Sequence, residues 1–141
     1  MKPTIDYFAT HAWRYHADWT KVAEMLERDD AAWWRNFSVP WYDPAFDPNT
    51  DLGRTHLHDW LESQIRPVHA VFYLASVHNI VSARKWLALE VKIARALGKP
   101  VFCLPDSEGR ETDPEVRATV DQTLPWNAEK LRSAVLGLAA A

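Results

Sequence analysis

The chain has 141 residues, enough for one domain with a hydrophobic core, and its 48% apolar and 25% charged residues are typical of a globular protein. A net charge of −3, with both signs interspersed, gives no electrostatic footprint for nucleic acid or an anionic membrane. No apolar run approaches the ~20 residues that span a bilayer, and the single cysteine excludes a disulfide framework. We therefore expect a single cytoplasmic domain over residues 1–141, with no secretory leader.

The N-terminal half is predicted to hold two strands and two helices. Residues 5–9 form the first strand, and apolar residues at helical spacing over 19–26 predict a helix after it. Residues 36–39 are a short strand candidate, followed by a loop rich in proline and aspartate. Apolar residues over 57–65 predict the second helix, which ends before Pro67.

The C-terminal half contains the two most apolar strands. Residues 70–75 and 101–104 are continuously apolar, which is typical of strands buried on both faces. Between them, residues 82–97 predict a helix that Ser82 caps and that Gly98 and Pro100 end. A weak last strand is expected within residues 116–121, and Asn127 is expected to cap a final helix.

Alternating strands and helices with continuously apolar strands predict a parallel sheet, an open doubly wound α/β fold of five strands with helices on both faces. Ligands bind such sheets beyond the carboxyl ends of the strands, at the switch point between the first and third strands. The residues there lack the acidic pair of a phosphoacceptor receiver and the glycine and hydroxyls of a flavin-phosphate loop. The four glycines form neither a dinucleotide-binding fingerprint nor a phosphate-binding P-loop.

A metal site is not predicted. His56 and His58 stand two residues apart on one predicted helix, so their imidazoles face in different directions. Exposed helix surface explains them better.

Glu90 lies where the core should be. On the 82–97 helix, Trp86, Ile93 and Leu97 line one apolar stripe, and Glu90 falls between Trp86 and Leu97. Burying an unpaired carboxylate costs several kcal/mol, so compensation is expected. Three explanations remain open: a paired or hydrogen-bonded structural glutamate, a wet position at the sheet edge, or a functional cleft that tunes its pKa.

Helix placement favours the cleft, because this helix follows the third strand and its beginning borders the switch point. Trp86 lies one turn before Glu90 on the same face. An indole beside a carboxylate suits a flat cationic ring and the positive charge next to it.

Three ordered motifs resemble a known family. They are "FATHAW" at residues 8–13, "SVPWYDP" at residues 38–44, and Trp86-x-x-x-Glu90 followed by "LGKPV". Together they resemble the TIR-like proteins of bacterial Thoeris antiphage systems, from Tyr7 to about residue 127. The family commonly has isoleucine and serine where this chain has Ala9 and Thr10, and threonine keeps the hydroxyl.

The resemblance implies a flavodoxin-like TIR fold that consumes NAD as a substrate, with no separate cofactor. Family enzymes cleave the nicotinamide–ribose bond, and Thoeris members make a cyclic or modified ADP-ribose signal that activates a separate effector protein. Glu90 matches the catalytic glutamate, and Trp86 would stack on nicotinamide or adenine. Self-assembly into a homo-oligomer, or a trigger, is expected to complete the site. The alternative is a non-catalytic TIR-like module for interaction or nucleotide binding.

Four further residues are candidates for the substrate crevice. Thr10, His11 and Trp13 follow the first strand, and Asp43 lies in the loop after the second. His11 would donate to phosphate or ribose, or anchor its loop. Trp13 would pack or contact the ligand, and Asp43 would bind ribose or brace its turn. Two weaker candidates follow the third strand: Ser76 and His78.

Overall fold

A computed structural model describes residues 2–12, 16–38 and 50–140 of the chain. Its elements alternate between strand and helix along most of the sequence. In chain order they are β1 (Thr4–Ala9), α1 (Ala17–Glu27), β2 (Trp33–Asn36), α2 (Asp51–Ile65), β3 (Ala70–Leu74), α3 (Ala75–His78), the 3₁₀ turn η1 (Val81–Ala83), α4 (Arg84–Ala96), β4 (Val101–Leu104), α5 (Pro114–Thr119), β5 (Gln122–Thr123) and α6 (Ala128–Ala140).

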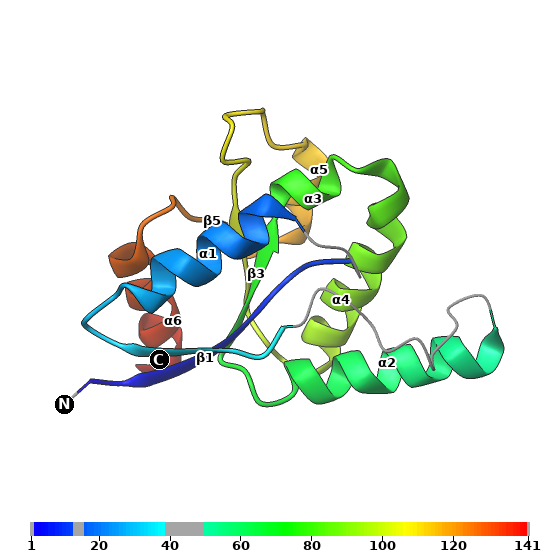
Figure 1. Ribbon diagram of the computed structural model, residues 1–141, viewed down its shortest axis with the longest axis horizontal. Coiled ribbons are helices and arrows are strands. Elements are labelled where there is room, and N and C mark those ends of the chain that lie inside the picture. Colours follow the sequence, from blue (N-terminus) through cyan, green and yellow to red (C-terminus); the bar gives the residue numbers. More distant parts are fainter. Residues whose placement is uncertain (1, 13–15, 39–49, 141) are drawn as a thin grey trace.

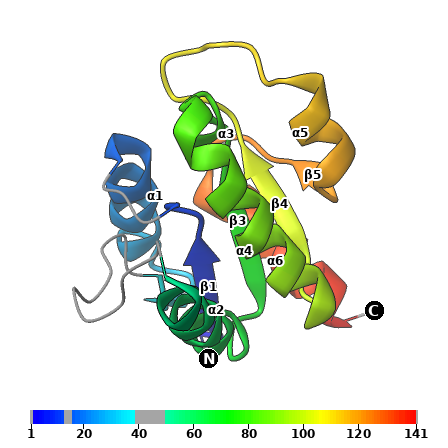
Figure 2. The same ribbon diagram turned by 90° about the vertical axis from the view of Figure 1, so that its right-hand side faces the viewer.

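The five strands form one sheet in the order β2-β1-β3-β4-β5, and every neighbouring pair is parallel. This is the strand order of the flavodoxin-like α/β fold, with its switch point between β1 and β3. The parallel doubly wound sheet predicted from the sequence is therefore confirmed. All the strands run toward the same edge, where α3, α5 and the start of α1 lie (Figure 2).

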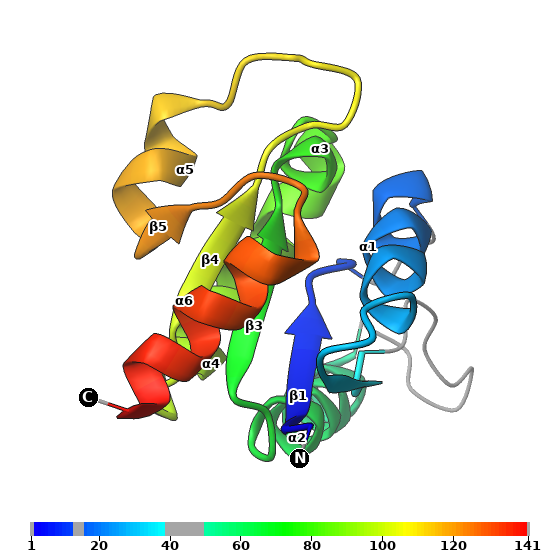
Figure 3. The ribbon, with the colours of Figure 1, turned by 90° about the vertical axis from the view of Figure 1, so that its left-hand side faces the viewer.

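Helices cover both faces of the sheet. In Figure 1, α1 and α6 lie on one side of the strands and α2 and α4 on the other. Figures 2 and 3 view the sheet from opposite directions, with α4 in front in one and α6 in front in the other. α2 packs against both α4 and β1. None of the helices formed by the described residues combines the length and apolar character needed to cross a bilayer.

The core lies along β1, β3 and β4, which explains why these strands are apolar on both faces. Phe8, Phe72 and Phe102 are almost completely buried, and Phe72 contacts Phe102 with ring centroids 6.5 Å apart. All residues of β3 and β4 are buried, whereas most of β2 is exposed or half-buried because it forms an edge of the sheet. The continuous apolar runs thus mark the centre of the sheet.

The weak strand predicted within residues 116–121 is wrong. Residues 114–119 form the helix α5, because Pro114 stands in its first turn and the Asp113 side chain accepts a hydrogen bond from Glu115 N. Proline and a capping aspartate are helix-start signals. The last strand follows as the two-residue β5, and both its residues are exposed.

Helix α4 begins later than predicted. Ser82 lies within η1 rather than at a cap, and α4 starts at Arg84 after Ala83, which makes no side-chain capping bond. Its end is as expected, because Gly98 has φ of +70°, a conformation that favours glycine. The second strand also begins earlier than predicted, and Val39 of that prediction lies outside the described residues. Asn127 caps α6 by accepting from Lys130 N at 3.0 Å, as predicted.

Two leucines of α2 test the core assignment with the same substitution. Leu61 is fully buried, whereas Leu52 is 68% exposed. Leu61→Ala should lower the free energy of unfolding by about 2–5 kcal/mol, because it removes buried methyl groups and leaves a cavity. Leu52→Ala should change it by less than about 0.5 kcal/mol. Urea denaturation followed by circular dichroism measures both, and equal effects would contradict the packing of α2.

Candidate functional site

The carboxyl ends of β1 and β3 are joined through Thr10. Its backbone N–H donates to Phe72 O at 2.9 Å, and its hydroxyl accepts from Leu74 N at 2.9 Å. Thr10 is fully buried. The sequence analysis expects this hydroxyl in a ligand crevice. In the structure it joins the two central strands, because its oxygen continues the hydrogen-bond ladder between them.

Glu90 reaches the same place from α4. Its side chain is fully buried, and Oε1 accepts from the backbone N–H groups of Ala12 at 3.3 Å and His11 at 3.5 Å. Oε2 is buried and makes no hydrogen bond with any residue that the structure describes. Such an unsatisfied buried oxygen is rare in proteins and calls for an explanation.

The surroundings of Glu90 favour its neutral form. Burial raises its pKa to about 8, although the hydrogen bonds from Ala12 and His11 act in the opposite direction. His11 is also fully buried, and burial lowers its pKa to about 3. His11 Nδ1 lies 3.6 Å from Glu90 Oε1, yet near pH 7 both side chains are neutral. The two residues therefore form a neutral contact and not an ion pair.

These contacts bear on two of the three explanations for Glu90, the wet position and the structural glutamate. The wet position at the sheet edge is wrong, because the side chain has no exposed surface. No arginine or lysine among the described residues pairs with Glu90, so a buried salt bridge does not hold it. Among the described residues, its hydrogen-bond partners contact Oε1 and none contacts Oε2. A tuned carboxyl in a functional cleft stays a prediction.

The backbone beside Glu90 is strained. Ala12 has φ of 50°, a left-handed conformation that a non-glycine residue adopts at a cost of order 1–3 kcal/mol. The bond from Ala12 N to Glu90 holds this turn in place. The His11 ring packs against Phe8 with centroids 5.3 Å apart, which fits the loop-anchoring interpretation of His11.

Trp86 is half-buried one turn before Glu90 and packs against the core. The Lys85 ammonium lies 5.1 Å from the centre of its ring, within range of a cation–π interaction. Trp13 and Asp43, the other two predicted crevice residues, lie outside the described residues. The structure thus brings Thr10, His11 and Glu90 together.

Sequence reasoning missed a second buried carboxylate at this edge. Asp18, in the first turn of α1, is only 2% exposed and accepts from Ser107 N at 3.2 Å and from the Ser107 hydroxyl. Burial alone would raise its pKa, but hydrogen bonds from Ser107 and the nearby Ser76 and His16 lower it overall. Asp18 therefore fastens the start of α1 to the loop after β4. Its place in a helix's first turn was readable, but its burial was not.

Of the two weaker candidates after β3, only His78 has side-chain hydrogen-bonding partners among the described residues. Ser76 is buried, and its Oγ makes no hydrogen bond with any of them. His78 Nδ1 lies 2.9 Å from the Tyr73 hydroxyl, and its Nε2 lies 3.3 Å from Asp113 Oδ2.

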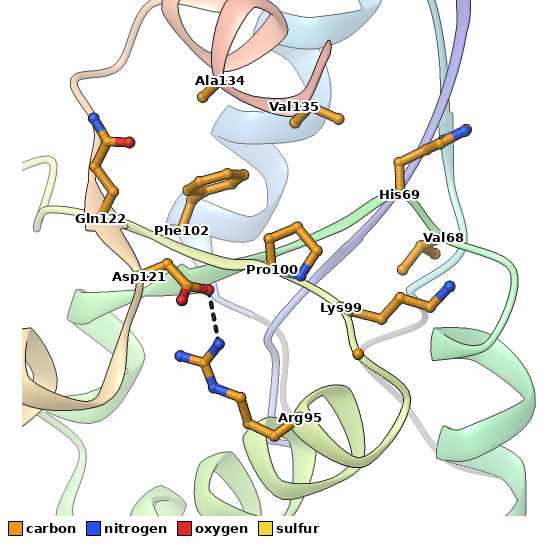
Figure 4. A pocket seen from close by; sticks show the side chains of 11 residues that line it. Val68, His69, Arg95, Lys99, Pro100, Phe102, Asp121, Gln122, Ala134 and Val135 are labelled. Atoms are coloured by element: carbon orange, nitrogen blue, oxygen red, sulfur yellow. Dashed lines mark hydrogen bonds and ion pairs between the residues drawn. The ribbon is translucent and has the colours of Figure 1, made fainter. Parts of the chain in front are cut away.

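A cavity of about 780 Å³ lies at the opposite edge of the sheet, near the amino end of β4. Figure 4 shows Phe102 and Val135 facing it, with Arg95 paired to Asp121 at 2.7 Å. A second cavity, of about 520 Å³, lies between α4 and α5. Of the described residues, neither Glu90 nor Thr10 nor His11 lines either cavity.

Among the described residues, two groups have ligand atoms close enough together for a metal ion: His58 with Asp59 and Glu62, and His78 with Asp113 and Glu115. The first belongs mostly to exposed helix surface, and His56 is not part of it. In the second, His78 already has a partner at each ring nitrogen.

Strand order and site together define an open flavodoxin-like α/β fold with a buried glutamate at the switch point of its sheet. No family model matches the chain, and no curated protein matches it.

The Thr10 bridge leads to a stability prediction. Thr10→Val keeps the shape but removes the acceptor of Leu74 N, so a buried N–H loses its partner at a cost of about 1–3 kcal/mol. Thr10→Ser keeps the oxygen and loses one buried methyl group, about 1 kcal/mol. Chemical denaturation of the two variants measures the difference. A valine variant as stable as wild type would show that the hydroxyl does not join the strands.

The raised pKa of Glu90 predicts a pH dependence of stability. Because the folded pKa, about 8, exceeds the unfolded value, 4.5, the folded state binds more protons between these pH values. Stability should therefore fall as pH rises, by about 1–2 kcal/mol from pH 6.5 to pH 8 relative to Glu90→Gln. His11 contributes with the opposite sign, mainly below its unfolded value of 6.5, and the part that remains above that pH is common to wild type and Glu90→Gln.

Parallel denaturation curves of wild type and Glu90→Gln at pH 6.5, 7.25 and 8 give the difference directly, since groups common to both proteins cancel. A constant difference across these pH values would mean that Glu90 is ionised in the folded protein.

Proposed function

We propose that this protein is a TIR-type enzyme that cleaves the nicotinamide–ribose bond of NAD and makes a cyclic or modified ADP-ribose signal for a separate effector in cytoplasmic antiviral defence. One observation carries the proposal: a fully buried glutamate at the switch point, with no cationic partner among the described residues and one oxygen unsatisfied. The motifs around residues 8–13 and 86–90 support it through their resemblance to the Thoeris proteins.

The chemistry needs a carboxylate in water-poor surroundings. When the glycosidic bond breaks, its electron pair leaves with nicotinamide, and positive charge develops on the ribose. An ionised Glu90 would stabilise that charge, and its Oε2 would accept a hydrogen bond from a ribose hydroxyl. Water then captures the ribose to give ADP-ribose, or another group of the same molecule closes a ring. Trp86 would stack against the nicotinamide or adenine ring.

On this proposal, the contacts of Glu90 would belong to a resting state of the enzyme. With a pKa of about 8, Glu90 is mainly protonated near neutral pH, and its Oε1 is held by the loop after β1. Substrate would have to displace this loop, and the newly polar surroundings would lower the pKa of Glu90. We therefore expect little turnover from the isolated chain and more after assembly into a homo-oligomer or after a trigger.

A non-catalytic module for interaction or nucleotide binding is the second candidate. It is favoured by Thr10 and His11, which hold strands and loop together rather than facing a described cavity. In that case Glu90 would only hold the backbone after β1 in place, and replacing it would change the free energy of unfolding alone.

The test is nicotinamide release from NAD, measured by chromatography at high protein concentration and after co-expression with phage components. Wild type should release nicotinamide, and Glu90→Gln should be at least about 100-fold slower, because it cannot supply negative charge. Glu24→Gln is the matched control, since Glu24 is an exposed glutamate on α1. It should retain wild-type activity.

Equal inactivity of wild type and both variants under all these conditions would favour the non-catalytic module. Equal activity of wild type and Glu90→Gln would remove Glu90 from the mechanism.

A further inference from the structure

The cavity between α4 and α5 is separate from the Glu90 site and has different lining residues. Its volume of about 520 Å³ falls in the range of ligand pockets, and it is bounded by β3, α3, α4 and α5. On α4 the lining residues Lys85, Ala88 and Lys92 recur at helical spacing on one face, and Glu90 is not among them. The cavity therefore opens on another side of α4.

The inner wall is apolar. Val91 and Val116 face the cavity and are 6% and 2% exposed, and the Tyr73 ring is 5% exposed. Aliphatic and aromatic side chains in this arrangement accept a small apolar group, because burying it removes apolar surface from water.

The mouth is positively charged. Arg84, Lys85 and Lys92 line it, and Glu115 is the one acidic residue among the described lining residues. Arg84 Nε donates to His78 O at 2.9 Å, which fixes the guanidinium, while its two terminal nitrogens make no hydrogen bond with the described residues. A guanidinium held in this way presents a fork that matches a phosphate or carboxylate.

His78 makes this arrangement rigid. Its ring lies between the Tyr73 hydroxyl, at 2.9 Å, and Asp113 Oδ2, at 3.3 Å, so it connects β3 to the start of α5. The same residue supplies the carbonyl that holds Arg84. Wall and mouth are therefore fixed relative to each other, which reduces the ordering cost of binding.

We propose that this cavity binds a small organic anion, in which a phosphate or carboxylate pairs with the Arg84 fork, Lys85 and Lys92 add positive charge at the mouth, and an apolar body enters toward Tyr73 and Val91. The proposal does not depend on NAD cleavage, because no residue of the Glu90 site takes part. Charge places the anionic group at the mouth, and apolar burial places the body inside.

Titration with phenyl phosphate and with benzoate, followed by ¹H–¹⁵N NMR, tests the site and distinguishes the two anionic groups. Amide shifts should concentrate in residues 84–92 and 115–119, with saturable binding. Inorganic phosphate lacks the apolar body and phenol lacks the anionic group, so each should bind at least about 10-fold more weakly than phenyl phosphate. Shifts concentrated elsewhere, or equal binding of phosphate and phenyl phosphate, would overturn the proposal.

Variants give the charge dependence. Arg84→Gln should weaken phenyl phosphate binding about 10-fold or more, and Arg84→Lys should fall between it and wild type, because lysine keeps the charge without the fork. Glu115→Gln should strengthen binding about 2–5-fold by removing the negative charge at the mouth. The control Lys130→Gln replaces an exposed lysine on α6, across the sheet, and should leave binding unchanged.

Unchanged binding in Arg84→Gln, with the fold intact by NMR, would overturn the site. Weaker binding in Glu115→Gln would overturn the charge argument. Neither outcome bears on nicotinamide release, so the two proposals stand or fall separately.

Discussion

The contact between the Glu90 carboxyl and the backbone after β1 is the constraint on which the switch-point edge depends. It stabilises the left-handed turn at Ala12 and keeps His11 within the core. Burial disfavours the charged form of the carboxyl and raises its pKa to about 8, so the neutral acid predominates near neutral pH. Local backbone geometry and proton binding are therefore coupled in one side chain.

Side-chain oxygens fasten the rest of this edge. Thr10 joins β1 to β3, and Asp18 joins α1 to the loop after β4 through Ser107. Ser38 accepts from Ala9 N at 3.2 Å and from Trp19 Nε1 at 3.0 Å, so it joins the end of β2 to β1 and α1. Strands stop here, and their last backbone groups need partners. Polar residues at the carboxyl ends of these parallel strands thus provide hydrogen-bond partners for backbone groups.

Sequence patterns predicted the central strands, most helices and the end of α4 because each depends on neighbours within a few residues. The positive φ at Gly98 is such a local feature. Residues 116–119 lie in a helix and not in the expected strand, because Asp113 and Pro114 just before them start α5. The apolar stripe of α4 singled out Glu90 but left open whether it is paired, wet or in a cleft, and it did not indicate the hydrogen-bond partners of Glu90. Glu90 and Ala12 are 78 positions apart, so only the folded chain brings them together.

Glu90 can both hold the backbone after β1 and act as a catalyst only if its hydrogen bonds to that backbone are weak. The bonds to its Oε1, 3.3 and 3.5 Å long, exceed the usual 2.9–3.0 Å, so each contributes at the lower end of the range for hydrogen bonds. Against them act the strain at Ala12 and the desolvation of a carboxyl whose second oxygen has no partner among the described residues. Opening the loop relieves both costs, and apolar packing around His11 and Phe8 opposes it. A polar ligand that entered here would have to overcome packing rather than strong hydrogen bonds, and hydration of Glu90 would then lower its pKa.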